Sequence, residues 1–548
     1  MSHALEEVAF PTLEESLIAD LSHCAHSQLR SFGDGETLIA AGDRDFKFFV
    51  ITSGAIEILD TSGDAPKTIT VHRAGGFTGD VSHLTGNPSI ITAVTRGATQ
   101  AYEVSAAALR QMLAQCPKLS DIVLQAFLAR RQLLRECHDF TGLRVIGSRY
   151  SRDTFRIREF LAKNRQLFTW LDLESDPDVQ ALLAHFGVSA AETPVVAFGQ
   201  QVLLRNPTNR ELADAIGIRR PLEKSVFDLA VVGAGPAGLA AAVYGASEGL
   251  NTVLLERTAP GGQAGMSMRI ENYLGFPTGI TGGELTDRAV MQANKFGARL
   301  SVPSPVAQLS FDKRYSVLTL DSGETVVAKC LLIATGADYR RLEVDGCEKF
   351  EGRGVYYAAT FNEAQLCRGT EVVVIGGGNS AGQAAVFLAS QARRVFHLIR
   401  GDDLYKNMSS YLAQRIEQTD NIELLCSTHV HAMHGDDHLA AIEIANRKTG
   451  EKSALDVQSM FSFIGAVPRT EWLPEEIETD EDGFILTGRD VTRSSGATTQ
   501  REPYLLETSR RGVFAAGDAR AGSVKRVASA VGEGSMAVQF AHAYLAEM

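Results

Sequence analysis

The sequence has few cysteines, and none of them stand close together. The nearest two, Cys330 and Cys347, are separated by 16 other residues, so there is no Cys-x-x-Cys pair and no Cys/His set with zinc spacing. We therefore expect reduced, mostly buried thiols and no metal site. The seven cysteines are Cys24, Cys116, Cys137, Cys330, Cys347, Cys367 and Cys426.

Long apolar runs and excess positive charge are also missing. No stretch approaches the roughly 20 apolar residues that a membrane-spanning helix needs. The N-terminus lacks the charged-then-apolar layout of a signal peptide. A net charge of −13 disfavours binding to nucleic acid or to anionic membranes. We expect a cytoplasmic protein that neither enters a membrane nor binds nucleic acid.

What the sequence does contain is ordinary globular composition over 548 residues, with 45% hydrophobic and 22% charged residues. At roughly 100–200 residues per domain, this length predicts three to five domains. Composition and pattern divide the chain into three blocks, and we expect a multidomain protein.

The first block, residues 1–136, begins with short apolar runs separated by turn residues. This pattern predicts a β-roll, and the helical spacing of residues 105–136 predicts two helices after it. The expected strands are Glu36–Ala40, Phe48–Thr52, Ala55–Leu59, Thr68–His72 and Ile90–Val94.

This block resembles a cyclic-nucleotide-binding domain, through Gly54 in Ser-Gly-Ala and through the stretch Phe77-Thr-Gly-Asp80. The resemblance implies a nucleotide-like ligand whose cyclic phosphate an arginine would hold. Here Ser89 stands in the arginine's place, and Asp80 replaces a glutamate. A phosphate without a charged partner in a partly buried pocket is unfavourable by several kcal/mol. A structural or dimerising module is the alternative.

The second block, residues 140–218, reads as β-α-β-α-β and then a last helix. Its order resembles a thioredoxin or glutaredoxin domain, which implies a cis peptide bond before Pro194. The loop that would carry Cys-x-x-Cys reads Ser148-Arg-Tyr-Ser-Arg-Asp153, without a thiol. This α/β module therefore cannot exchange disulfides, and we expect a docking or spacer role.

The third block opens with a dinucleotide-binding pattern. The apolar run Phe227–Val232 leads into Gly233-Ala-Gly-Pro-Ala-Gly238, and a small-residue helix follows. These glycines permit a tight turn, close approach of a pyrophosphate, and close packing of the helix on the strand. A second strand ends at Glu256, whose carboxylate can accept hydrogen bonds from ribose hydroxyls.

The pattern recurs at Gly376-Gly-Gly-Asn-Ser-Ala381, where Ala381 takes the third glycine's place. The next strand ends at Arg400 instead of an acid. A positive charge at this point suits a 2′-phosphate, so NADPH is favoured over NADH. An apolar strand ending in Gly517-Asp518 then resembles the segment that holds the ribityl chain and phosphate of FAD in flavoproteins with two dinucleotide sites.

With these motifs, residues 226–548 resemble the low-molecular-weight thioredoxin reductase family. Further fingerprints are Pro260-Gly-Gly-Gln263, Ile270-Glu-Asn-Tyr-Leu-Gly-Phe-Pro277, Ala334-Thr-Gly-Ala337 and Phe463-Ile-Gly-Ala466. The resemblance implies two Rossmann-like domains, for FAD (226–342 and 463–548) and for NAD(P) (343–462). It also implies a homodimer, and a rotation between the domains that brings the nicotinamide to the flavin.

The resemblance also implies the cofactor-contacting residues. For FAD they are Gly233, Gly235, Pro236, Ala237, Gly238, Glu256, Arg257, Gly262, Gln263, Asn272, Val306, Gly336, Gly517, Asp518, Lys525, Arg526 and Val527. For the nicotinamide dinucleotide they are Gly376, Gly378, Asn379, Ser380, Ala381 and Arg400. No catalytic acid, base or nucleophile is predicted, because hydride transfer is the chemistry of the cofactors.

The chain departs from the family where the redox disulfide should be. The family has Gly-Val-x-x-Cys-Ala-Thr-Cys, and this chain has Ala358 and Phe361 in place of the two cysteines. The family's His-Arg-Arg motif has a second arginine, and this chain has Gly401 at that position. We therefore expect an NADPH-dependent flavoprotein with an unidentified electron acceptor. A redox or ligand sensor and a ferredoxin–NADP⁺ reductase-like enzyme are the alternatives.

Overall fold

The computed structural model describes residues 2–24, 27–44, 46–61, 65–136, 143–177, 179–198, 201–219, 222, 225–492 and 501–548. It divides into two compact units. Unit 1 contains residues 1–147, 165–222 and 290–303, and unit 2 contains residues 148–164, 223–289 and 304–548. Cys137 and the predicted start of the second block at residue 140 lie outside the described residues.

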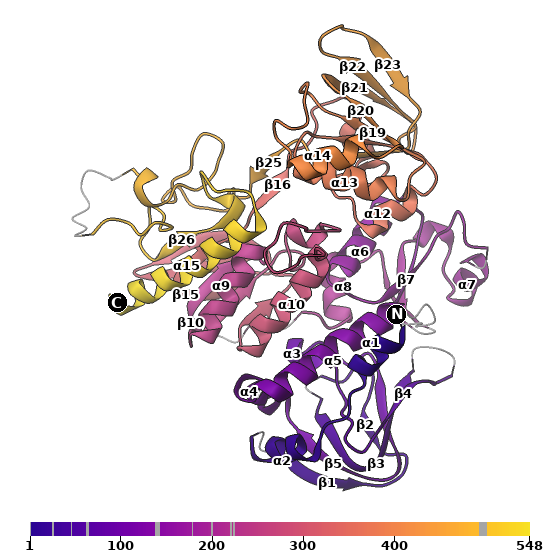
Figure 1. Cartoon of the computed structure of the whole chain (residues 1–548), viewed down its shortest axis with the longest axis vertical. Helices are drawn as coiled ribbons and strands as arrows, with labels where there is room; N and C mark the ends of the chain where they lie inside the picture. The colour runs from indigo at the N-terminus through magenta and orange to yellow at the C-terminus, as the bar shows by residue number, and fades with distance from the viewer. Residues whose placement is uncertain are drawn as a thin grey trace. The chain divides into compact units, whose positions relative to one another are not determined.

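Unit 1 begins with an antiparallel sheet in the order β1-β5-β3-β4, with β2 paired to β5 (Figure 1). Its elements are α1 Ser2–Ala9, α2 Glu15–Cys24, β1 Gln28–Phe32, β2 Thr37–Ile39, β3 Phe48–Asp60, β4 Lys67–Arg73, α3 Ser82–Thr85, β5 Thr92–Val104, α4 Ala106–Gln115 and α5 Pro117–Glu136.

The prediction of two strands around Gly54 was wrong, because one strand, β3, continues through it. Gly54 has a φ of +81°, and a Cβ there would lie 2.5 Å from the Ala98 carbonyl oxygen. The pairing register of β3 with β5 shifts at this point.

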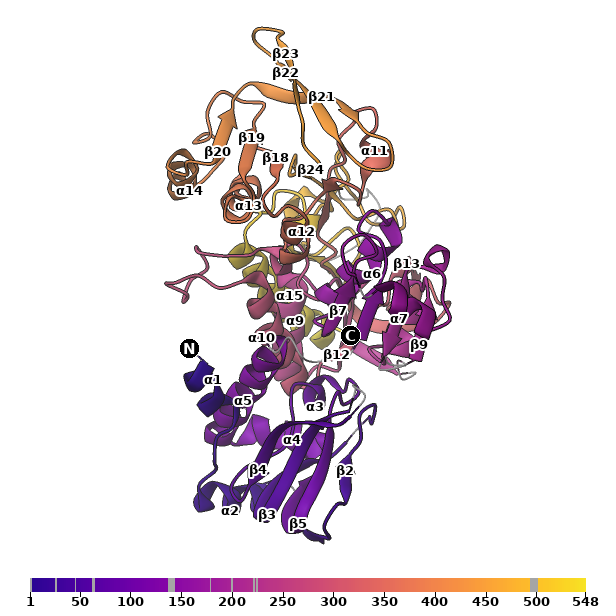
Figure 2. The same ribbon diagram turned by 90° about the vertical axis from the view of Figure 1, so that its right-hand side faces the viewer.

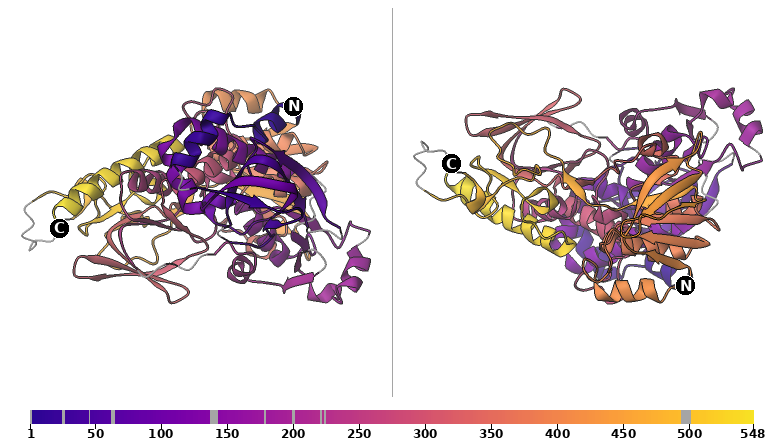
Figure 3. Two further views of the ribbon diagram at one scale, coloured as in Figure 1. Left: turned by 90° about the horizontal axis from the view of Figure 1, so that it is seen from below. Right: turned by 90° about the horizontal axis from the view of Figure 1, so that it is seen from above.

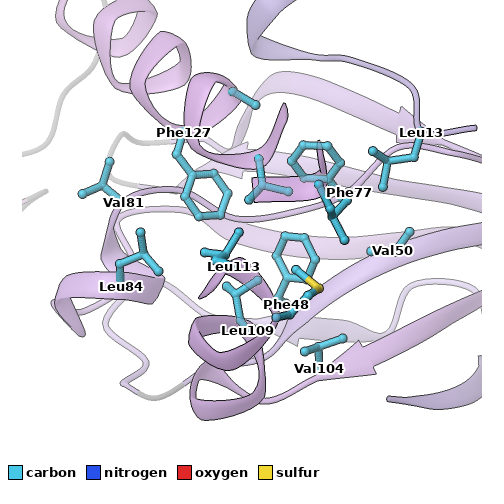
Figure 4. Close-up of a cluster of buried hydrophobic side chains, with 14 of the residues drawn as sticks. Leu13, Phe48, Val50, Phe77, Val81, Leu84, Val104, Leu109, Leu113 and Phe127 are labelled. Atoms are coloured by element: carbon cyan, nitrogen blue, oxygen red, sulfur yellow. The ribbon is translucent and has the colours of Figure 1, made fainter. Parts of the chain in front are cut away.

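Helices α4 and α5 pack on this sheet through an aromatic and aliphatic cluster. Phe48, Phe77 and Phe127 are fully buried at its centre, and Figure 4 shows them among Leu109, Leu113 and the other members. Burying a side chain of this size contributes roughly 1.5–3 kcal/mol. Met291, from the last turns of α10 (Gly282–Lys295), belongs to the same cluster.

A second sheet in unit 1 has the order β7-β6-β8-β9. Strand β6 pairs parallel with β7 and antiparallel with β8. The peptide bond between Thr193 and Pro194 is cis, as predicted, whereas strand β9 was missed. The elements of this part of the chain are β6 Leu143–Ile146, α6 Arg152–Lys163, β7 Phe168–Leu171, α7 Val179–His185, β8 Val195–Phe198, β9 Gln201–Arg205 and α8 Asn209–Ala215.

Unit 2 contains a sheet in which β11, β10, β15, β14 and β13 are neighbours and β26 pairs parallel with β15. Helices α9 and α15 pack against each other beside it, and α15 is the yellow helix at the C-terminus in Figure 3. The elements are β10 Val226–Val232, α9 Pro236–Ser247, β11 Thr252–Leu255, β13 Val306–Asp312, β14 Tyr315–Leu320, β15 Thr325–Ile333, β26 Val513–Ala515 and α15 Val527–Ala546. Strand β12, Arg299–Ser301, belongs to unit 1.

A parallel sheet of order β17-β24-β18-β19-β20 forms the other half of unit 2, with α13 and α14 beside it (Figure 2). The elements are β16 Ala337–Tyr339, α11 Cys347–Phe350, β17 Val355–Tyr356, α12 Phe361–Leu366, β18 Glu371–Ile375, α13 Asn379–Ala389, β19 Arg394–Leu398, α14 Ser410–Glu417, β20 Ile422–Leu425, β21 Thr428–His434, β22 Ala441–Asn446, β23 Lys452–Leu455, β24 Ser459–Ser462 and β25 Ala466–Pro468. Strands β16 and β25 pair where the chain passes between the two halves. Among the described residues, no helix combines the length and the apolar character needed to cross a membrane.

Candidate functional site

The first glycine turn connects β10 to α9, and close packing explains two of its glycines. A Cβ on Gly233 would lie 2.3 Å from the Ala334 carbonyl oxygen, and one on Gly238 would lie 1.8 Å from the Gly233 carbonyl oxygen. Gly235 has open space, with no atom nearer than Gly262 Cα at 4.0 Å. Gly235 caps α9, and Pro236 begins it. The backbone N–H groups at this helix start are therefore approachable by a pyrophosphate.

Glu256 lies at the end of β11, and its carboxylate is held against the glycine turn. Its Oε2 accepts a hydrogen bond from the Ala234 N–H at 2.7 Å, and its Oε1 accepts one from Thr258 at 2.9 Å. The loop that contains Gly262 reaches the same place, because the Gly261 N–H donates to the Ala234 carbonyl at 2.7 Å. A carboxylate fixed beside the turn is what ribose recognition requires.

Asp518 is brought to the same helix start from a distant part of the sequence. It follows β26, and a Cβ on Gly517 would lie 3.2 Å from Ala237 Cβ. Glu533 on α15 accepts a hydrogen bond from the Gly517 N–H at 2.7 Å and pairs with Arg520 at 2.6 Å. Burial raises the pKa of Asp518, while the charge of Lys525 lowers it. The structure therefore places the segment of Gly517 and Asp518 beside the start of α9.

The other predicted FAD residues lie in several different segments of unit 2. Gln263 Nε2 donates to the Ala337 carbonyl at 2.5 Å, which places its side chain beside the strand after Gly336. Val306 begins β13, just after Ser304, whose N–H donates to the Glu256 carbonyl at 2.7 Å. Arg257, Lys525 and Arg526 are exposed, and Val527 begins α15. Asn272 is exposed in the loop closed by the bridge between Ile270 and Ile280.

Two residues that the sequence did not single out support this site. Thr286 on α10 lies against the Gly261 loop, where a Cβ on Gly261 would approach its Oγ1 to 2.6 Å. Gly534 lets α15 cross α9, because a Cβ there would lie 2.1 Å from the Ala237 carbonyl oxygen. A threonine in a helix and a glycine in a helix carry no motif, so only the packing identifies them.

The second glycine turn, between β18 and α13, has the same construction. A Cβ on Gly376 would lie 2.5 Å from the Phe463 carbonyl oxygen, and Ala381 Cβ lies 3.0 Å from that position. Ala381 thus occupies the place of the third glycine. Gly378 caps α13 and has no neighbour within 4 Å of a built Cβ. Asn379 Oδ1 accepts a hydrogen bond from the Ser409 N–H at 2.8 Å, which ties the helix start to the next loop.

His397 is a further residue that the motif did not predict. It is fully buried on β19, and its Nε2 lies 2.8 Å from the Gly376 carbonyl oxygen. Burial lowers the pKa of His397, so the imidazole is neutral near pH 7. Because a carbonyl can only accept, Nε2 carries the proton and donates it to the turn. His397 therefore holds the first glycine of the nicotinamide turn from the adjacent strand.

Arg400 follows β19 and is exposed. The loop that it begins also contains Asp402, which pairs with Lys448 at 3.5 Å. A backbone hydrogen bond, with the charges of Lys448 and Lys406, lowers the pKa of Asp402. Arg400 and Lys406 supply positive charge to this loop, which suits a phosphate, although Asp402 and Asp403 lie in the same loop.

The residues present fit both dinucleotides. At each turn, the second glycine of the motif leaves space where a pyrophosphate must approach, and neither helix start is capped by a side chain. The acid beside the first turn suits ribose hydroxyls, and the cations beside the second suit a phosphate. Among the described residues, no cluster of His, Cys, Asp and Glu could hold a metal ion.

The segment that should hold a redox disulfide contains no thiol. It runs from β17 to α12. At the start of α12 the Thr360 N–H donates a hydrogen bond to the Glu363 carboxylate at 2.7 Å. Cys367 is completely buried, and burial raises its pKa to about 12. Of the other described thiols, those of Cys330 and Cys347 are buried, and those of Cys116 and Cys426 are partly exposed. Cys367 therefore has none of the features of a reactive thiol.

In the N-terminal module, Ser89 stands at the position of the phosphate-binding arginine. Ser89 is buried, and its hydroxyl donates to the Ile91 carbonyl of its own loop at 2.8 Å. Arg130 on α5 is also buried, and it donates to the carbonyls of Ala9, Phe77 and Gly79 at 2.8, 3.0 and 2.5 Å. Both side chains thus bind the backbone of the module itself.

Buried His72 makes this module sensitive to acid. Burial, with the charge of Arg130, lowers the pKa of His72 to about 3, whereas the unfolded value is near 6.5. The folded state therefore resists protonation, and its stability falls as the pH drops below 6.5. At pH 5 the expected loss is about 2 kcal/mol. Urea unfolding of the full chain at pH 7 and pH 5 should show this loss in the wild type, and His72→Leu should lose about 2 kcal/mol less. Burial also lowers the pKa of His83 in the same module, so a loss from that residue remains in His72→Leu. An equal pH dependence in the wild type and in His72→Leu would contradict this expectation.

The comparisons with known proteins agree with this geometry. Residues 227–534 match the family described as "Pyridine nucleotide-disulphide oxidoreductase", and residues 29–116 match "Cyclic nucleotide-binding domain".

The thioredoxin reductase of Listeria innocua is 32% identical over 60% of this chain and 96% of its own length. That of Bacillus subtilis is 33% identical over 60% of this chain and 97% of its own. The crystal structure of Lactococcus lactis thioredoxin reductase has 30% identity and a TM-score of 0.53, over 59% of this chain and all of its own. The chain belongs to the pyridine nucleotide-disulphide oxidoreductase family, as a thioredoxin-reductase-like NAD(P)H-dependent flavoprotein with an N-terminal cyclic nucleotide-binding domain.

Proposed function

We propose that this protein oxidises NADPH and delivers the electrons from its flavin to an acceptor other than thioredoxin. The observation that carries the proposal is the segment 354–361, which resembles the family's redox-disulfide stretch but has Ala358 and Phe361 where the family has its redox cysteines. Bound FAD supplies the electron transfer between the nicotinamide and the acceptor. The chain supplies the two dinucleotide turns, the carboxylates of Glu256 and Asp518, and the cationic end of β19.

The assignment of domains is part of this proposal. Residues 226–342 and 463–548 would bind FAD, residues 343–462 would bind NADPH, and residues 140–218 would form a thioredoxin-like module without redox activity. The rigid packing of both glycine turns supports the first two assignments, and the sheet order β7-β6-β8-β9 supports the third. By analogy with the thioredoxin reductases that it resembles, we propose a homodimer.

Anaerobic mixing of the purified flavoprotein with NADPH or NADH tests the electron input. We expect the flavin absorbance to bleach with either nucleotide and at lower concentrations of NADPH. A flavin that neither nucleotide reduces would contradict the proposal. A subsequent screen of quinones, small disulfides, oxygen and electron-transfer proteins would then identify the acceptor.

Arg400 should account for much of the preference for NADPH. Replacing it by glutamine removes a charge-assisted contact worth about 1.5–3 kcal/mol, so the KM for NADPH should rise roughly 10- to 100-fold. The KM for NADH should stay within about twofold, because NADH has no 2′-phosphate. The matched control is Arg394→Gln, which removes an arginine that pairs with Glu423 at the other end of β19. Equal losses for both nucleotides in Arg400→Gln would refute this role.

A further inference from the structure

We propose that the face of the nicotinamide-binding part formed by α11, β17 and the turn between them is a protein-docking surface, and that its occupant is helix α6 of the same chain. All the contacts lie within unit 2, to which α6 belongs. The inference concerns which side chains cover this face. It therefore does not depend on the proposed NADPH oxidation, although it narrows the choice of electron acceptors if that proposal is correct.

Arg152, in the first turn of α6, makes the polar contacts. Its Nε donates to the Glu351 carbonyl at 2.9 Å, and its Nη2 donates to the Glu348 carbonyl at 2.8 Å. Its Nη2 also lies 3.7 Å from the Glu351 carboxylate. A planar guanidinium with two donors on two carbonyls fixes an orientation as well as a distance. The start of α6 is therefore held in one register against the turn after α11.

Phe155, one turn further along α6, makes the apolar contacts. Its ring centroid lies 5.5 Å from that of Tyr356 on β17, within the range of favourable aromatic pairs. Phe155 also packs against the buried cluster that contains Ala359 and Cys367. Gly352 has a φ of +72°, and a Cβ there would lie 3.7 Å from Phe155 Cδ1, so the turn passes closely beside the ring.

Two contacts extend the covered area on either side. Tyr150, just before α6, stacks on His438 with 4.5 Å between ring centroids. Glu159, one turn after Phe155, lies near enough to the buried carboxyl of Glu363 to contribute to raising its pKa. Glu159 also pairs with Lys163 at 2.7 Å within the helix. Helix α6 thus contacts this face through Arg152 and Phe155, and Tyr150 extends the contact to His438.

The covered face and the covering helix share one property. The face adjoins residues 358–361, where the reductase cysteines are absent, and α6 directly follows residues 148–151, where the thioredoxin-like cysteines are absent. The face that would present a reductase disulfide is thus covered by a helix from a thioredoxin-like module, and other residues replace the cysteine pairs on both sides. Cys347, which begins α11, is buried. With α6 in place, a protein acceptor cannot use this face, so electrons must leave the flavin by another route.

Hydrogen–deuterium exchange of the full-length flavoprotein tests the contact. The double variant Arg152→Ala/Phe155→Ala should raise amide exchange in residues 352–360 at least about tenfold, because local opening no longer has to break these contacts. The matched control is Arg510→Ala/Phe311→Ala, in which Arg510 similarly donates to a carbonyl, that of Lys313, and lies over the Phe311 ring. It should leave exchange in residues 352–360 unchanged.

Two results would overturn the inference. One is unchanged exchange in residues 352–360 of the double variant. The other is protection of that segment in the wild type when oxidised thioredoxin is added, since a covered face should not respond. If the double variant loses its flavin, Arg152→Gln replaces it, and a smaller rise in exchange confined to the same segment is expected. An unchanged Arg152→Gln profile would count against the inference in the same way.

Discussion

Protein carrying Gly534→Ala is expected to be purified almost without flavin. Gly534 lies where α15 crosses α9, and a Cβ would stand 2.1 Å from the carbonyl oxygen of Ala237. That oxygen belongs to the backbone of the first turn of α9, so no side-chain rotation can relieve the contact. Forcing the two helices apart is unfavourable by about 1–3 kcal/mol or more. The displacement also falls on the turn that must approach the pyrophosphate.

The same helix offers a matched control two residues away. Gly532 has no atom within 4 Å of a built Cβ, so Gly532→Ala should keep its flavin. It should also gain up to about 1 kcal/mol, because alanine is the better helix former. The ratio of flavin to protein absorbance after gel filtration measures both outcomes. Normal flavin content in Gly534→Ala would show that the crossing tolerates a methyl group and would remove the proposed reason for this glycine.

The second expected result is that NADPH produces no reduction of oxidised thioredoxin by this protein, even while an artificial acceptor is turned over. In a disulfide reductase the flavin electrons enter an adjacent disulfide and reduce it to two thiols, and this chain has alanine and phenylalanine at the positions of the two cysteines. The nearest remaining thiol, Cys367, is buried with a pKa raised to about 12. One buried, protonated thiol cannot replace a pair.

Reductive titration without oxygen isolates the cause. The wild-type flavoprotein should take up about two electrons per flavin, because no second redox centre is present. The variant Ala358→Cys/Phe361→Cys, which restores the family spacing, should take up about four. Uptake of four electrons by the wild type, or reduction of thioredoxin at an ordinary enzymatic rate, would show that another disulfide takes part. The single variant Ala358→Cys serves as the control that adds a thiol without a partner.

Much of this architecture could be predicted from local patterns. The runs before Gly233 and Gly376 are apolar because both strands are buried in parallel sheets, and the motif glycines are required by backbone contacts within a few residues. Helix α6 begins after its cap, Ser151, whose hydroxyl accepts a hydrogen bond from the Thr154 N–H. These features depend on residues close in sequence, so composition and spacing are sufficient to find them.

Predictions failed where pairing partners decide the structure. Two strands were expected around Gly54, but β3 continues through the glycine because β4 and β5 pair with both of its halves. Strand β9 was missed because its stability comes from pairing with β8, which a short polar-apolar run does not reveal.

The sequence by itself determined the two dinucleotide turns, their order, the cation after the second one, and the absence of any Cys-x-x-Cys pair. These are properties of residue type and short spacing, and folding does not alter them. Only the tertiary structure decided that Asp518 lies near the first turn, that Gly534 permits a helix crossing, that His397 holds the second turn, and that α6 covers the face beside residues 358–361. Each of these contacts joins residues separated by about 20 to 300 positions, so its existence depends on how the sheets pack.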